Sequence, residues 1–119
     1  MIDWQRYNDT FQWYGKDVEI ELIGILKEEY DDRMGKIARN VADRDFEQLK
    51  FNAHSLKGSI ANYHAFEPVE LVRELESKAK ENDADGIDDL LIRLQVSTKC
   101  LLDELLEHRQ LLLDEKAQL

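Results

Sequence analysis

The 119-residue sequence contains few of the residues that build turns and cross-links, with one Pro, five Gly and one Cys. A single cysteine excludes an intramolecular disulfide, and there is no cysteine cluster to bind zinc. An all-β fold needs many turns, and the sequence has too few Pro and Gly residues to build them. Basic residues are also scarce, because 16 Lys and Arg stand against 26 Asp and Glu, for a formal net charge of -10. Nucleic-acid affinity depends on basic side chains that neutralise phosphates, so we expect no nucleic-acid partner.

Long hydrophobic runs and low-complexity tracts are absent as well. The apolar runs are far shorter than the roughly 20 residues needed to cross a bilayer, so we expect no membrane association. No basic segment followed by an apolar stretch opens the chain, which indicates no signal peptide. We therefore expect a cytoplasmic protein. The length suits one domain over residues 1–119.

What the sequence does contain is helical periodicity. Aromatic residues at intervals of three and four predict a short N-terminal helix over about residues 2–14, which we expect to lie as a lid on the rest: Trp4, Tyr7, Phe11 and Tyr14. A longer helix is predicted from about Asp17 to Asn40, with one apolar side: Ile23, Leu26, Tyr30, Met34, Ile37 and Val41.

Three further helices are predicted, and Asp43-Arg44-Asp45 supplies capping groups for the first of them. That helix ends near residues 64–66 and carries Phe46, Leu49, Ala53, Leu56, Ile60 and Tyr63. Pro68 fits the first turn of the next helix, whose inward residues are Leu71, Leu75 and Ala79. After a polar break at residues 82–86, the last helix carries Ile87, Leu91, Leu94, Thr98, Leu101, Leu105 and Leu112, with His108 on the same face. The predicted fold is all-α, an antiparallel up-and-down four-helix bundle over about residues 17–112 with a short extra N-terminal helix.

The segment 53–62, AHSLKGSIAN, contains the residues that point to chemistry. At 100° per residue, His54 lies roughly 130° from the centre of the apolar face, so we expect it to be exposed. The residues on its side of the helix are Lys50, Lys57, Gly58 and Ala61. An isolated exposed histidine is most often an ordinary surface residue, and its neighbours are what favour a function here.

Gly58 is an unusual choice inside a helix, where glycine costs about 1 kcal/mol relative to alanine. Together with Ala61 it leaves a low surface beside His54, which another protein's active site can approach. Lys57 is three residues from His54, so its ammonium group can offset the charge of a phosphoryl group carried there. Lys50 is placed at the rim of the same docking surface.

A neutral imidazole is a competent nucleophile near neutral pH. Phosphoryl transfer also needs Mg²⁺ and an acceptor carboxylate, because charge develops on the phosphoryl oxygens. The sequence has no motif that holds a nucleotide, a cofactor or a metal. We therefore expect a partner protein to supply the Mg²⁺ and the catalytic groups.

The motif His54-Ser55-Leu56-Lys57-Gly58-Ser59, preceded by Ala53, resembles the phosphoacceptor motif of histidine-containing phosphotransfer (HPt) domains. The resemblance extends from about residue 17 to residue 107, and the segment 71–76 is similar to the family's following helix. It implies that His54 accepts a phosphoryl group from a receiver-domain aspartate and passes it to another receiver. The implied partners are receiver domains of response regulators or hybrid histidine kinases, and the chain is a carrier rather than an enzyme. The family commonly has a glycine where this chain has His64, so we expect an altered helix end or altered docking there.

Two other functions are also carried out by helical domains and are alternatives to this one. The phosphoacceptor domain of a histidine kinase usually has an acidic residue after its histidine and a proline a few positions later, whereas here Ser55 follows and the next proline is Pro68. A helical docking module that binds or inhibits a receiver without phosphoryl chemistry stays open. A di-metal bundle is disfavoured because no histidine has a glutamate three residues before it. One bundle with one exposed histidine needs no second copy, so we expect a monomer.

Overall fold

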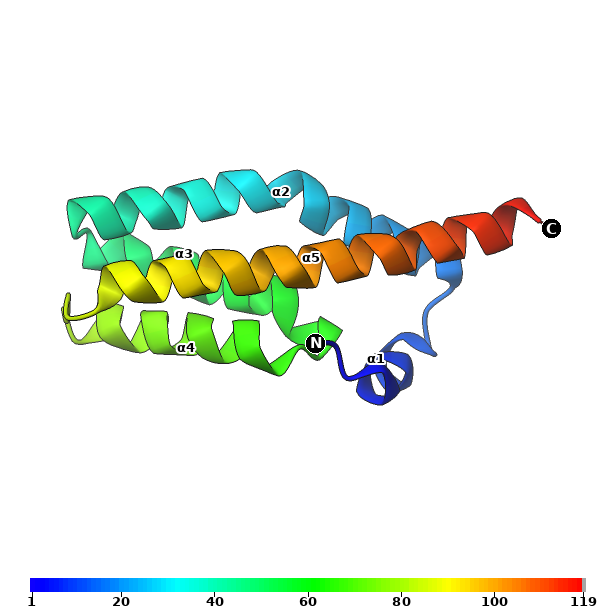
Figure 1. The fold of residues 1–119 in the computed structure, drawn as a ribbon, viewed down its shortest axis with the longest axis horizontal. Helices are drawn as coiled ribbons and strands as arrows, with labels where there is room; N and C mark the ends of the chain where they lie inside the picture. The colour runs from blue at the N-terminus through cyan, green and yellow to red at the C-terminus, as the bar shows by residue number, and fades with distance from the viewer. Residues whose placement is uncertain (119) are drawn as a thin grey trace.

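The computed structural model describes residues 1–118 and is helical throughout (Figure 1). Its helices are α1 (Trp4–Phe11), α2 (Lys16–Asp43), α3 (Phe46–Ile60), α4 (Phe66–Lys80) and α5 (Ile87–Ala117), with a short 3₁₀ turn, Ala61–Tyr63, after α3. Successive helices of the bundle run in opposite directions (Figure 1). The predicted antiparallel four-helix bundle with an extra N-terminal helix is confirmed.

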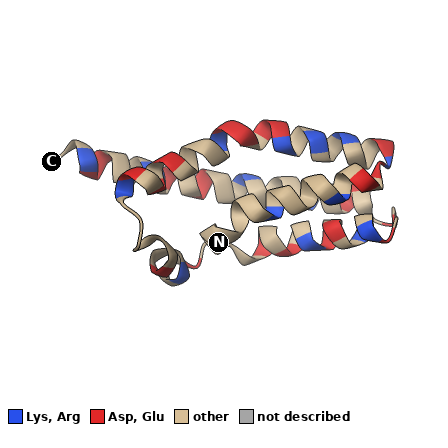
Figure 2. Cartoon of the chain, turned by 180° about the vertical axis from the view of Figure 1, so that it is seen from behind, with Lys and Arg blue, Asp and Glu red and all other residues tan. Residues whose placement is uncertain are grey.

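The four long helices form a bundle in which α3 and α5 each pack against α2 and α4. Consequently α3 and α5 occupy opposite corners, and each has one side turned to the outside. The C-terminal part of α5 continues beyond the bundle beside the start of α2, and α1 lies near that end (Figure 1). Charged residues of both signs are spread along the outsides of the helices (Figure 2).

The helix ends follow from local capping groups. The Asp45 carboxylate accepts a hydrogen bond from the backbone N–H of Gln48 at 3.2 Å, so the predicted cap of α3 is present. Asp3 caps α1 in the same way through the N–H of Arg6. Pro68 lies in the first turn of α4, as expected.

The core consists of the apolar residues that the periodicity selects. The whole predicted series on α2 is buried, and so is the next series, Leu49 to Ile60 on α3 and Tyr63 in the 3₁₀ turn, while Phe46 is half-buried. In the last helix Leu91 is half-buried rather than buried. No helix within residues 1–118 is long and apolar enough to cross a membrane.

Four predicted boundaries are wrong. The helix expected to end near residues 64–66 is α3, which ends at Ile60 and is followed by the 3₁₀ turn. The N-terminal helix covers Trp4–Phe11 rather than residues 2–14, so Tyr14 lies past its end and is 50% exposed. The second helix continues to Asp43, and its end is set by Arg44, which adopts the left-handed conformation at φ 54°. The last helix continues to Ala117, beyond residue 112.

Candidate functional site

His54 lies in the middle of α3 on its outward side. The buried residues of this helix, including Ala53 and Leu56 on either side of His54, face the core. The His54 side chain is 71% exposed, so the expected orientation is confirmed. A nucleophile in this position is accessible to another protein.

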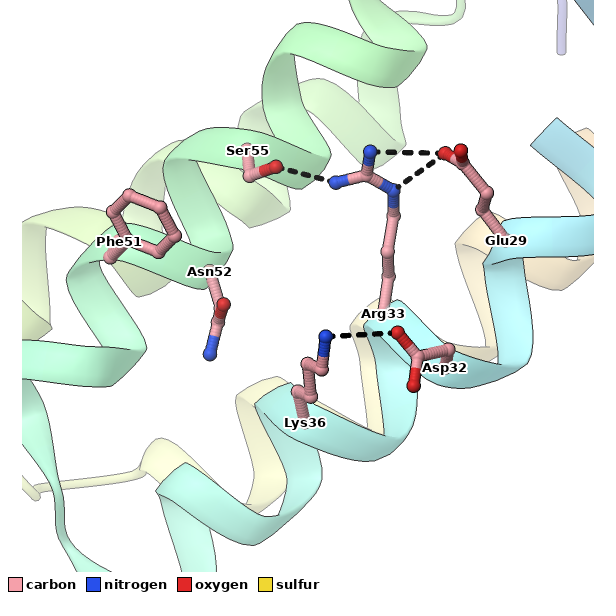
Figure 3. A pocket seen from close by; sticks show the side chains of 7 residues that line it. All are labelled: Glu29, Asp32, Arg33, Lys36, Phe51, Asn52 and Ser55. Atoms are coloured by element: carbon pink, nitrogen blue, oxygen red, sulfur yellow. Dashed lines mark hydrogen bonds and ion pairs between the residues drawn. The ribbon is translucent and has the colours of Figure 1, made fainter. Parts of the chain in front are cut away.

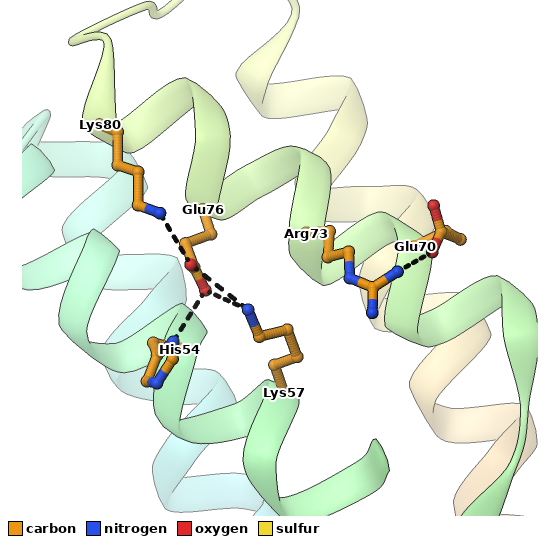
Figure 4. Close-up of polar contacts among 6 residues, drawn as sticks. All are labelled: His54, Lys57, Glu70, Arg73, Glu76 and Lys80. Atoms are coloured by element: carbon orange, nitrogen blue, oxygen red, sulfur yellow. Dashed lines mark hydrogen bonds and ion pairs between the residues drawn. The ribbon is translucent and has the colours of Figure 1, made fainter.

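The His54 ring is held from one side by Glu76, which comes from α4 (Figure 4). Nδ1 of His54 lies 3.3 Å from Oε2 of Glu76, whose side chain is only 8% exposed. A carboxylate can only accept, so this bond places the proton of the neutral ring on Nδ1. The lone pair is then on Nε2, the nitrogen that Glu76 leaves free.

The same carboxylate binds two lysines. Lys57 Nζ is 3.1 Å from Oε2 of Glu76, and Lys80 Nζ is 3.3 Å from Oε1 (Figure 4). Burial raises the pKa of Glu76, but the hydrogen bonds from the two lysines, the charge of Lys57 and the bond with His54 outweigh it. The pKa of this carboxyl is therefore below its ordinary value, and Glu76 is ionised at neutral pH.

Neither Glu76 nor Lys80 is indicated as a site residue by the spacing of the sequence. Both come from α4, and Glu76 is 22 residues from His54. Lys57 also differs from the simplest expectation, because its ammonium group contacts Glu76 instead of standing alone beside the imidazole. The one indication in the sequence is that Glu76 and Lys80 are four residues apart, which makes them neighbours on one helix.

The surface beside His54 on α3 is low. Gly58 is exposed, and a Cβ atom built there meets no atom within 4 Å. Packing inside this chain therefore does not require glycine at that position. Ala61 is also exposed, but it lies in the 3₁₀ turn just past α3 rather than in the helix, and Lys50 is exposed one turn before His54.

A family model described as the Hpt domain matches residues 21–115. The chain belongs to the Hpt domain family. It is therefore a phosphotransfer module of two-component systems, a class of phosphocarriers rather than catalysts that interact with phosphorelay components such as receiver domains.

The fold of this Hpt domain is shared with a solved protein. The crystal structure of histidine-containing phosphotransfer protein B from Pseudomonas aeruginosa PAO1 matches with a TM-score of 0.84. The match covers 92% of this chain and 94% of that one at 18% sequence identity, a level that supports the shared fold alone. No curated protein sequence matches the chain.

The other flank of α3 in this Hpt domain is braced by α2. Arg33 donates to the hydroxyl of Ser55 and to the carboxylate of Glu29, so it joins the residue after His54 to α2 (Figure 3). Lys36 pairs with Asp32 in the same pocket at 3.0 Å. Both cations already have a carboxylate partner on α2, and the bond from Arg33 to Ser55 is what joins the motif helix to α2 here.

His64 ends the motif segment, as expected. Its backbone has φ 58°, in the left-handed region where glycine is unstrained and other residues are uncommon. This conformation gives a physical reason for the glycine that the family commonly has there. In this chain the His64 side chain forms a hydrogen bond with Thr10 at 2.7 Å, and its carbonyl accepts from the N–H of Asp3.

Among residues 1–118, no group of three or more His, Cys, Asp and Glu side chains is arranged to hold a metal ion. The side chains gathered around His54 are one carboxylate and two ammonium groups. This set suits the binding of a charged group carried on the imidazole.

Proposed function

We propose that this Hpt domain accepts a phosphoryl group on Nε2 of His54 from the aspartyl phosphate of a receiver domain and passes it to another receiver. The observation that supports this most directly is an exposed imidazole whose Nδ1 is bonded to a buried carboxylate. That arrangement leaves Nε2 as the nucleophile and fixes the orientation of the ring.

In the proposed step, the Nε2 lone pair attacks the phosphorus of the aspartyl phosphate. The bond from phosphorus to the aspartate oxygen breaks, and the aspartate leaves as a carboxylate with the bonding electrons. The proton on Nδ1 stays in place, so the phosphorylated ring becomes cationic. The ionised Glu76, 3.3 Å away, stabilises that positive charge, and transfer to the next receiver reverses the step.

The phosphoryl group itself brings about 1.5 to 2 negative charges. We assign Lys57 to stabilise that charge, because it lies on the adjoining turn of the same helix and shares a carboxylate with His54. Gly58 and Ala61 leave room for the receiver, and Lys50 contributes a positive charge at the rim of the docking surface. The receiver provides the Mg²⁺ and the acceptor aspartate, and the carrier acts as a monomer.

The deciding experiment is incubation with a phosphorylated receiver domain and Mg²⁺, with the label followed into this chain. We expect acid-labile, alkali-stable label that is absent from the His54→Gln variant, with helical content unchanged by circular dichroism. Equal label in His54→Gln would show that the phosphoacceptor is elsewhere. No transfer from a broad panel of receivers to the folded parent would favour a docking module without phosphoryl chemistry.

A further inference from the structure

A second cluster of titratable side chains is buried away from His54, where α1 meets the bundle. Tyr7 of α1 donates its hydroxyl to Oε2 of Glu19 on α2 at 2.5 Å. Nε2 of His108 on α5 lies 2.8 Å from that same oxygen. One carboxylate therefore ties three helices together, and these three residues are called the latch below.

The latch is enclosed. Tyr7 is 1% exposed and Glu19 is 9% exposed. The ring of Trp4 lies over the His108 ring with a centroid distance of 4.7 Å, and the Tyr7 ring meets it edge-on at 5.2 Å. A hydrogen bond from a phenol to a carboxylate is among the stronger ones in proteins when the surrounding side chains exclude water from it.

The charge of Glu19 acts on the phenols around it. Burial raises the pKa of Tyr7, and the hydrogen bond and charge of Glu19 raise it further. Burial, and then the charge of Glu19, raises the pKa of Tyr63 to about 12. Both phenols therefore keep their protons at neutral pH, and Tyr7 remains a donor to the carboxylate.

Helix α1 places Tyr7 and Phe11 in the core but has few polar contacts with the bundle besides the latch. It has eight residues, and a helix this short is marginal in water by itself. Apart from the hydrogen bonds of the latch, the ring of Phe11 packs against Tyr63, the ring of Trp4 lies against His108, and Thr10 bonds to His64. The residues before α1 are attached through the N–H of Asp3 and a bridge between Ile2 and Ala65.

Helix α1 also forms part of a groove that reaches Gly58, on the turn of α3 after the phosphoacceptor. One wall of this groove consists of Thr10, Phe11 and Tyr14, and Leu22 and Ile25 of α2 lie along it. Gly58 lines the groove from α3, one helical turn after His54. Any protein that covers His54 and Gly58 therefore meets the surface that α1 completes.

We propose that α1 is a releasable wall of this groove, and that the latch of Tyr7, Glu19 and His108 sets the fraction of molecules in which the wall is in place. The occupant of the groove is the receiver domain, so this inference rests on the proposed function. The latch is an affinity-determining device: it acts on docking through α1 and leaves the chemistry of His54 unchanged.

Two variants test the latch with little change in volume. Tyr7→Phe removes one hydroxyl and keeps the aromatic packing, and Glu19→Gln removes the charge. Glu21→Gln, an exposed position two residues further along α2, is the matched control. The measurements are amide hydrogen exchange of α1 with α3 as internal reference, affinity for an unphosphorylated receiver, and labelling of His54 by phosphoramidate, a small phosphoryl donor.

We expect α1 amides to exchange about 10- to 100-fold faster in both latch variants, as for the loss of a hydrogen bond to a charged group. Exchange of α3 and phosphoramidate labelling should match the parent. Receiver affinity should fall by the factor by which the exchange rates show the fraction of molecules with α1 in place to have fallen, because only those molecules present the complete groove. Glu21→Gln should match the parent in all three measurements.

Each contrary result has a distinct meaning. Unchanged exchange of α1 in both variants would overturn the latch. Receiver affinity that is unchanged although the exchange rates show a lower fraction of molecules with α1 in place would overturn its role as a wall. A parent chain that is labelled by phosphoramidate on His54 but binds no receiver would overturn the groove as a receiver site while leaving the carrier chemistry standing. Failure of phosphoramidate to label His54 in the parent would overturn the proposed function, and the exchange data would still decide the latch.

Discussion

The molecule contains two histidine–glutamate pairs in which the glutamate is the more buried member, and they differ mainly in how far the histidine is exposed. In the pair His54–Glu76 the glutamate is 8% exposed and the histidine 71%, with 3.3 Å between the bonded atoms. In the pair His108–Glu19 the side chains are 22% and 11% exposed, and the distance is 2.8 Å. The first pair holds a ring at the surface with Nε2 free, whereas the second bonds Nε2 and covers the ring with aromatic side chains. The same two side chains thus suit a reactive site in one place and a structural contact in the other.

Replacing each histidine by glutamine should separate the two roles most strongly. His54→Gln should lose phosphoryl uptake down to background, while its free energy of unfolding changes by less than about 0.5 kcal/mol, as for an exposed position. His108→Gln should keep its uptake from phosphoramidate but lose about 1–3 kcal/mol of stability, because it disturbs a hydrogen bond to a buried carboxylate. Labelling and urea unfolding measure the two effects, and the opposite pattern would contradict the comparison.

Removing the charge of Glu76 should weaken the reactive pair without displacing the ring. We expect Glu76→Gln to slow phosphoryl uptake about 10- to 100-fold, because the cationic phosphorylated ring loses its counter-charge. Glu74→Gln is the control, since Glu74 is exposed on the same helix. Equal rates for Glu76→Gln and the parent, measured by rapid quenching, would show that Glu76 only packs beside the site.

The stability contributed by Glu76 should depend on pH with a definite sign. Its pKa in the folded chain is lowered, so the ionised carboxylate stabilises the fold above the ordinary glutamate pKa of about 4.3. That contribution is lost as the pH falls below this value and through the lowered pKa. We therefore expect the stability difference between parent and Glu76→Gln to be constant near neutral pH and to shrink below about pH 4.3. Urea unfolding from pH 7 to pH 3 measures it, and a difference that grows on acidification would be inconsistent.

Crowding the surface beside His54 should make it more like the enclosed His108. Gly58→Ala should raise the free energy of unfolding by about 0.5–1 kcal/mol, because a Cβ there meets open space and alanine favours helix. Transfer from a receiver should slow slightly, and Gly58→Phe should slow it much more. Gly35→Ala, in the middle of α2, is the control for the gain in stability alone. Unchanged transfer in Gly58→Phe would show that the low surface has no role in docking.

The fold was predictable because its information is local. The apolar series of α2 and α3 follow the helical period, and the predicted residues from Ile23 to Val41 are all buried. The helix ends were less predictable. Arg44 ends α2 in a left-handed conformation, although the residue is not the glycine that usually marks such an end. Tyr14 continues the aromatic spacing after α1 has ended at Phe11.

Only the part of the site that lies on α3 was predictable from the sequence. The exposure of His54 and Gly58 follows from angles around α3, and the structure agrees. The position of Glu76 depends on how α4 packs against α3, and that register is set by side chains of both helices at once. Spacing along the sequence does not reveal this packing register, so the sequence does not identify Glu76 as a residue of the site.

The sequence distances within the two histidine clusters imply an order of assembly. His54 and Glu76 are 22 residues apart and belong to two consecutive helices, so the site forms within a single helical hairpin. Glu19 and His108 are 89 residues apart, and their contact requires the ends of the chain to come together. Contacts of low sequence separation form early in folding, because little chain entropy is lost in closing the loop between them. A partly unfolded chain that has shed α1 and the end of α5 should therefore still hold His54, Lys57, Glu76 and Lys80 together.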